Sequence, residues 1–210
     1  DKMIDKRVVI KQRMPYAYLH EALSQQLGEG YDSQKIREGL SITYKGETVL
    51  NEVENQIKSI VTNSPLQGFM SEHREELVVA MRNESDRQVI IMALVAARYP
   101  FCYQMLCAFA NQLRLQDTVS TALMKRVIGN VYGLNVKIDK AFHSALSTLV
   151  ETGMVVKEKE GVYSAALPHA INHRIARALW EESFYINNPL WSRENTDDLI
   201  FEPYFRYITN

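Results

Sequence analysis

The stretch from Ser120 to Ser164 constrains the fold more than any other part of the chain, because its pattern changes from helical to β-like in a fixed order. A first amphipathic helix is expected at its start, capped by a hydroxyl side chain and ended by Gly133. A longer helix is expected from about Lys137 to Thr152, with apolar residues repeating at helical spacing along one face. Gly153 is expected to stop it.

A β-hairpin is expected directly after this second helix. Residues 154–157 and 161–164 are rich in β-prone side chains, and they flank a charged turn that contains Gly161. Two such segments around a glycine-containing turn are typical of a hairpin. The region from Asp117 to Ala165 therefore predicts helix, turn, helix and hairpin, in that order.

The preceding 115 residues predict a bundle of helices, with a short strand at Arg7–Ile10 as the one exception. Gly39 is expected to end the second helix, and Ser85 is expected to begin a capping box before an apolar run. The last two helices are apolar on nearly every side, which is typical of central core helices. The expected helices are 15–27, 32–36, 47–61, one beginning at 71, 85–97 and 101–115.

The C-terminal part, residues 167–210, predicts a helix followed by a tail rich in aromatic side chains. So much aromatic area is rarely left in water, so the tail either packs back on the body or docks on another subunit. Its aromatic residues, with those of the helix before it, are Trp180, Phe184, Tyr185, Trp191, Phe201, Tyr204, Phe205 and Tyr207.

Charge and composition favour a protein of the cytoplasm. The formal net charge is −1, so any attraction to nucleic acid must come from a local patch. The most apolar run, Val89–Ala97, is shorter than the roughly 20 residues of a membrane span, and the N-terminus does not resemble a signal peptide. Cys102 and Cys107 lie in an apolar run, as reduced and buried thiols do.

No catalytic, metal or cofactor site is expected. The sequence has no phosphate-binding glycine loop and no serine or cysteine triad signature. His169 and His173 have the i, i+4 spacing of zinc ligands on a helix, but no third ligand lies near them in the sequence. We therefore expect them at a partly exposed start of the C-terminal helix.

The segment Ala145–Lys157, followed by Gly161–Tyr163, resembles the winged-helix superfamily, in which an apolar-rich helix ends at a glycine and leads into the wing. The resemblance implies a mainly α fold with three parts: a helical N-terminal half (1–115), a winged helix with a small hairpin wing (116–166), and a C-terminal helix with its aromatic tail (167–210).

In a winged helix the second helix of the helix-turn-helix can enter the major groove of DNA. Lysine and arginine neutralise phosphate, whereas asparagine, serine and histidine can bond to base edges. Double-stranded DNA is therefore the expected partner. The candidate DNA-binding residues are Lys125, Arg126, Asn135, Lys137, Lys140, His143, Ser144, Ser147, Lys157 and Lys159.

Charge balance keeps a second interpretation open. Residues 117–165 hold six basic and five acidic side chains, and no arginine is expected on the exposed face of the long helix, although strong DNA binders show a basic excess. The alternative is a subunit that uses the winged helix and the aromatic tail to bind protein partners or a second copy of itself.

The order of a helical half followed by a winged helix is similar to that of two families. One is the small BrxA-type component of BREX phage-exclusion systems, which implies a non-catalytic DNA-binding role in a multi-component prokaryotic defence system. The other is the PCI-type module, which implies subunit assembly, although the helices of this chain show no repeat.

Overall fold

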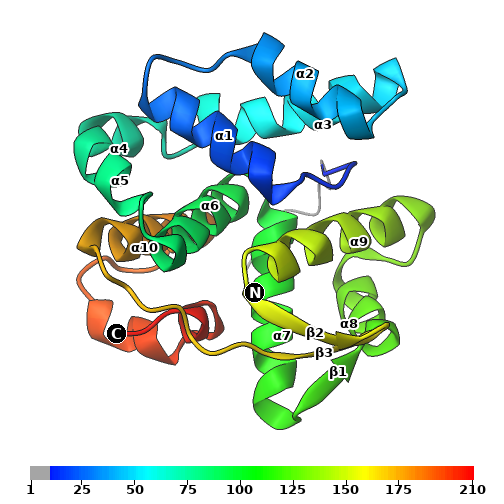
Figure 1. The fold of residues 1–210 in the computed structure, drawn as a ribbon. Coiled ribbons are helices and arrows are strands. Elements are labelled where there is room, and N and C mark those ends of the chain that lie inside the picture. The colour runs from blue at the N-terminus through cyan, green and yellow to red at the C-terminus, as the bar shows by residue number, and fades with distance from the viewer. Residues whose placement is uncertain (1–9) are drawn as a thin grey trace.

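The computed structural model describes residues 10–210, so most of the strand expected at Arg7–Ile10 lies outside the described residues. The chain is mainly helical and carries a small antiparallel sheet, which confirms the expected fold class at that level (Figure 1). The helices are α1 (Tyr16–Leu27), α2 (Ser33–Thr43), α3 (Glu47–Thr62), α4 (Gln67–Glu72), α5 (Arg74–Ala80), α6 (Glu84–Arg98), α7 (Pro100–Leu115), α8 (Thr121–Tyr132), α9 (Val136–Glu151), α10 (Arg174–Asn187), and the 3₁₀ helices η1 (Thr196–Phe201) and η2 (Pro203–Tyr207).

Helices α1, α2 and α3 pack together at one end of the molecule (Figure 1). Asp32 caps α2 by accepting a hydrogen bond from the backbone N–H of Lys35, as its position before the helix predicts. The prediction that Gly39 ends α2 is wrong, because the helix continues to Thr43. A Cβ at Gly39 would lie 2.3 Å from Cε1 of Tyr18, so this glycine permits close packing of α2 on α1.

Two other helix starts also differ from those expected. The helix expected from Ser71 is divided at His73 into α4 and α5. The expected capping box at Ser85 is wrong, because Asn83 caps α6 by accepting from the N–H of Asp86. Ser85 lies inside the helix, where its hydroxyl donates to the carbonyl of Ala170 at 2.8 Å. The side chain of Ser85 therefore makes a tertiary hydrogen bond instead of capping α6 as the local sequence pattern predicted.

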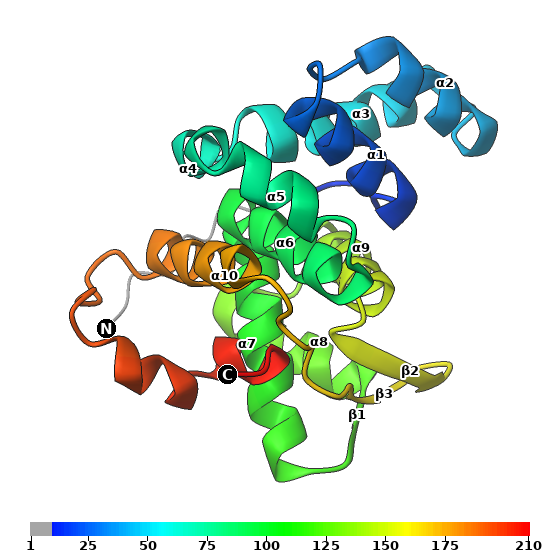
Figure 2. The ribbon, with the colours of Figure 1, turned by 60° about the vertical axis from the view of Figure 1, so that its left-hand side comes forward.

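Helices α6 and α7 lie at the centre of the molecule and carry much of the buried apolar surface, as their sequence predicts (Figure 2). Within residues 10–210, no single helix is both long and apolar enough to cross a bilayer; α6 and α7 meet that test only as a pair, and they are bent by 119°. The bend falls at Tyr99, directly before Pro100.

The C-terminal segment packs on these central helices: α10 lies against α6, and η2 lies against α7. Trp180 is fully buried, stacks on Tyr204 with ring centroids 4.1 Å apart, and donates from Nε1 to the Tyr204 carbonyl at 3.0 Å. The hydroxyl of Tyr207 donates to the carbonyl of Leu106 in α7. Phe201, in contrast, is 75% exposed.

The sheet joins the expected hairpin to a strand that precedes α8. Strands β2 (Val155–Lys159) and β3 (Val162–Ala165) form the hairpin, with Gly161 at φ +76° in its turn. Strand β1 (Thr118–Ser120) pairs antiparallel with β3, so the strand order is β1-β3-β2. The hairpin is thereby held against the start of α8, where the N–H of Thr121 donates to the Gly161 carbonyl at 3.0 Å.

The expected placement at a partly exposed start of the C-terminal helix is wrong for His169, which is buried and precedes α10, whereas His173 is the N-cap residue of α10 and is partly exposed. Nε2 of His169 donates to the carbonyl of Thr152 at 2.9 Å, whereas Nδ1 of His173 lies 2.6 Å from the buried carboxylate of Asp86. The two imidazoles therefore hold different partners, and no cluster of metal ligands occurs among residues 10–210.

Burial lowers the pKa of His169 below its ordinary value of 6.5, because the charged imidazolium loses solvation there. A lowered folded-state pKa means that the unfolded chain binds the proton more tightly. The stability contributed by neutral His169 should thus be complete above about pH 6.5 and be lost as the pH falls through the lower folded-state value. An NMR titration of the imidazole resonances should give a midpoint below 6.5, and a midpoint at or above 6.5 would contradict this environment.

A candidate nucleic-acid interface on α9 and the hairpin

The amino-terminal end of α9 and the turn of the β2–β3 hairpin lie on the same side of the molecule (Figure 1). Asn135 caps α9, accepting from the N–H of Ile138 at 3.0 Å, and Gly133 makes the turn from α8 with φ +90°. Lys137, Lys140 and His143 follow on the exposed surface of α9. Their spacing places them along the first two turns of the helix.

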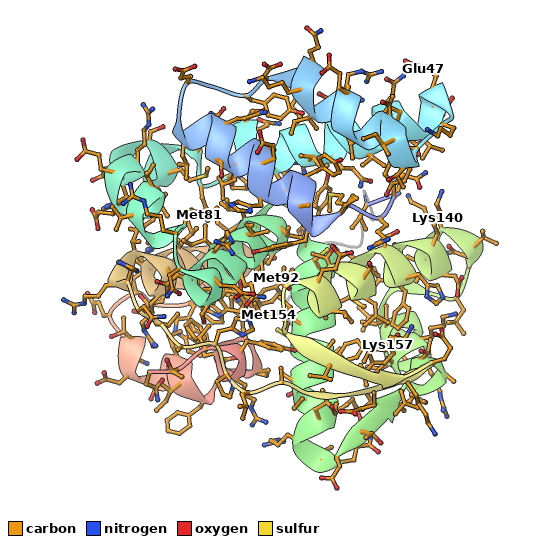
Figure 3. All side chains as sticks on the ribbon, viewed as in Figure 1. Glu47, Met81, Met92, Lys140, Met154 and Lys157 are labelled. Carbon is orange, nitrogen blue, oxygen red and sulfur yellow. The ribbon has the colours of Figure 1, made fainter. Side chains whose placement is uncertain are left out.

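The hairpin lies within electrostatic reach of this helix surface. Glu160 at the turn has a lowered pKa, first because Lys157 donates a hydrogen bond to it at 2.7 Å, and in smaller part because of the charge of His143 on α9. Lys140 on α9 and Lys157 on β2 lie on the same side of the molecule (Figure 3). We call this surface, made by residues 135–143 and 157–160, the α9–hairpin face.

Neighbouring cations neutralise two acidic side chains of this region, Asp139 and Glu160. Lys125 of α8 forms an ion pair with Asp139 of α9 at 2.7 Å, and this hydrogen bond is the main reason that the pKa of Asp139 is lowered. His143 lies 3.9 Å from the same carboxylate. Lys157 pairs with Glu160, which raises the pKa of the lysine. Exposed pairs of this kind add little to stability, but they cancel negative charge locally.

Four candidate residues keep an exposed cation with no carboxylate of residues 10–210 within 4.0 Å. Three of them, Lys137, Lys140 and Lys159, belong to the α9–hairpin face, and the fourth, Arg126, lies on α8. Six basic and five acidic residues nearly cancel over residues 117–165. Ion pairing removes one cation with each anion and leaves this near-balance unchanged, but it shows which cations face solvent or a ligand without a carboxylate partner. On the same hairpin, Glu158 is an exposed carboxylate that pairs with no cation among residues 10–210.

The second half of the polar side of α9 is covered by the chain that leads into α1. Arg13 donates from Nε to Oγ of Ser147 at 2.7 Å and forms an ion pair with Glu151, which raises the pKa of Arg13. The backbone N–H of Tyr16 also donates to Glu151, at 2.7 Å. The carbonyl of Arg13 is in turn held by the hydroxyl of Tyr44 at 3.1 Å.

Two of the ten candidate residues are therefore not available as expected. Ser144 is only 6% exposed, so its predicted placement on the exposed face of α9 is wrong. The buried side of α9 is wider than its apolar residues alone indicate, because it also includes the polar residues Ser144 and Thr148. Ser147 is half-buried and already bonded to Arg13. The contact of Arg13 with Ser147 and Glu151 could not be predicted from the sequence, because these residues are separated by more than 130 positions and no local pattern connects them.

An apolar patch adjoins the α9–hairpin face at the turn between α8 and α9. Leu134 and Val136 are 77% and 86% exposed. Beside them a cavity of about 130 Å³ is lined by Ile128, Ile138 and Phe142, with the Lys125–Asp139 pair also in its wall. Exposed aliphatic side chains next to an apolar hollow are a feature of protein-binding surfaces.

No protein-family model, no curated protein and no solved structure matches this chain significantly.

Proposed function

We propose that residues 117–165 form a winged helix that binds double-stranded DNA, mainly through the phosphate backbone. The support for the module is its element order, with α7 packed against α8 and α9, and with β1 joined to the β2–β3 hairpin. The biological setting that we propose, a prokaryotic multi-component system such as phage defence, rests on the sequence resemblance alone.

The observation that carries the DNA proposal is the exposed basic charge of the α9–hairpin face and of Arg126. Lys137 and Lys140 extend from the amino-terminal turns of α9, which a major groove is wide enough to admit. Lys159 on the hairpin and Arg126 on α8 supply phosphate contacts to either side. With Ser144 buried and Ser147 covered, few groups remain to bond base edges, so modest sequence preference follows.

The salt dependence of binding tests this proposal. If the four unpaired cations each neutralise one phosphate, the logarithm of affinity falls with the logarithm of salt concentration with a slope of about −3.6. Between about 50 and 200 mM salt the affinity should then decrease roughly a hundredfold. Fluorescence anisotropy with a labelled duplex measures this slope. An affinity that does not change with salt, or no binding at the lowest salt, would rule out the phosphate mechanism.

A protein-assembly role is the second candidate, and the apolar patch at Leu134 and Val136 is the observation that favours it. In that role the same surface would dock on another subunit, and binding would be insensitive to salt because it would rest on apolar burial. Leu134→Ser with Val136→Ser would then abolish the complex, whereas DNA binding through phosphate would survive these changes.

A further inference from the structure

Another cavity, lined by polar residues, lies away from the α9–hairpin face, between α3, the end of α6 and the segment before α1. Its volume is about 250 Å³, several times the roughly 30 Å³ that one water molecule occupies in the liquid. The cavity is open to solvent, and its lining includes Gln56 and Ser59 of α3, Arg98 and Tyr99 at the end of α6, and Lys11.

Two of the lining side chains on α3, Gln56 and Ser59, are already held by hydrogen bonds. Oε1 of Gln56 accepts from the backbone N–H groups of Lys11 and Gln12, and its Nε2 donates to the Gln12 carbonyl at 2.9 Å. Ser59 donates to the Gln56 carbonyl at 2.8 Å, so its oxygen accepts from the hydroxyl of Tyr99 at 3.0 Å. The cavity is thus a preformed space.

Unlike Gln56 and Ser59, Arg98 has an unused hydrogen-bond donor, because its Nε is buried and has no hydrogen-bond partner among residues 10–210. A buried guanidinium N–H without an acceptor is costly, and such a group calls for an explanation by a bound species. The guanidinium carbon lies 5.2 Å from the ring centroid of Tyr99, and this contact orients the planar donor group.

Lys11 adds a second cation to the same cavity. Its ammonium group has no carboxylate within 4.0 Å in the described part of the chain. An arginine fork and a lysine that converge on one space match the geometry and charge of a tetrahedral oxyanion. Glu52 is the one acidic side chain in the lining, and its carboxylate is occupied by Nε2 of Gln12 at 2.6 Å.

We propose that this cavity binds a small oxyanion of the phosphate class, with Arg98 as the bidentate donor and Lys11 as the second charge. The site shares no residue with the α9–hairpin face, so it is independent of the proposed DNA binding. Glu52 opposes the ligand by like charge and sets a limit on its affinity.

Calorimetric titration of the full chain with inorganic phosphate, against sodium chloride of equal ionic strength, tests the site. We expect saturable binding with a Kd of about 1 mM or tighter. Arg98→Gln should weaken it about tenfold or more, since it removes charge-assisted hydrogen bonds. Arg98→Lys keeps the positive charge but loses the paired N–H donors of the guanidinium. Its affinity for phosphate should lie between that of the unaltered chain and that of Arg98→Gln.

Glu52→Gln is the sharpest variant, because it should tighten phosphate binding while the arginine variants weaken it. Lys58→Gln, at an exposed position of α3 outside the lining, changes the net charge by the same amount as Arg98→Gln and should leave the affinity unchanged. Absence of saturable binding, or an equal loss for Lys58→Gln and Arg98→Gln, would overturn the proposal. A circular-dichroism spectrum and a thermal melt of each variant establish that it is folded.

Discussion

Duplex DNA binding should fall by on the order of a hundredfold at low salt when Lys137 and Lys140 are both changed to glutamate. Both ammonium groups are exposed on the first turns of α9 and have no carboxylate partner among residues 10–210. The two substitutions reverse the charge at both positions. They remove two contacts to DNA phosphates and add two negative charges that repel the phosphate backbone of the DNA. The salt slope should become smaller by about two units, because two fewer counterions are released.

The matched control is Lys35→Glu with Lys58→Glu, which changes the net charge by the same amount at exposed positions of α2 and α3. This variant should bind DNA much as the unaltered chain does, since neither lysine belongs to the α9–hairpin face. Equal losses in the two double variants would mean that overall charge, and not this face, governs binding.

Trp180→Ala should lower the free energy of unfolding by about 3–5 kcal/mol, the range for large aromatic residues removed from a core. The indole is fully buried and stacked on Tyr204, and its N–H satisfies a carbonyl of the C-terminal segment. Its removal leaves a cavity between α10 and η2 and an unpaired acceptor.

Phe201→Ala provides the comparison within the same segment. This side chain is 75% exposed, and its truncation should change stability by less than about 0.5 kcal/mol. Urea unfolding followed by circular dichroism gives both values. A small effect of Trp180→Ala would contradict the packing of the C-terminal segment on the central helices.

The helical pattern and the hairpin could be predicted because both depend on local information. Spacing of apolar residues predicted α3, α7 and α9 within one or two residues, and Gly153 and Gly161, both at positive φ, mark the end of α9 and the turn of the hairpin as expected. These features are fixed by residues adjacent in sequence, so a single sequence is sufficient to show them.

Tertiary contacts account for what could not be predicted. In the sequence Gly39 looks like a glycine that ends a helix. In the structure it lies inside α2, where the absence of a Cβ leaves room for the ring of Tyr18. The third strand, β1, is only three residues long, and its pairing with β3 crosses more than 40 positions of sequence. Nothing near Ser147 indicates that Arg13 covers it.

The candidate interface could be predicted only in part, because its ion pairs also depend on tertiary contacts. The lysines of α9 and the hairpin could be named from helical spacing, and they are exposed as expected. Which acids neutralise which cations, as in the pair of Lys125 with Asp139, depends on how α8 packs on α9. The cations that are left without a carboxylate partner can therefore be identified only once those pairs are assigned.

Chemical-shift mapping on the ¹⁵N-labelled chain tests the central claim most directly, because it locates the DNA without altering any residue. Addition of a short duplex at low salt should shift the amide resonances of residues 135–143 and 157–160 and leave those of α2 and α3 in place. Shifts confined to α1–α3 or to the aromatic C-terminal segment, or no shifts at all, would contradict the assignment of DNA binding to α9 and the hairpin.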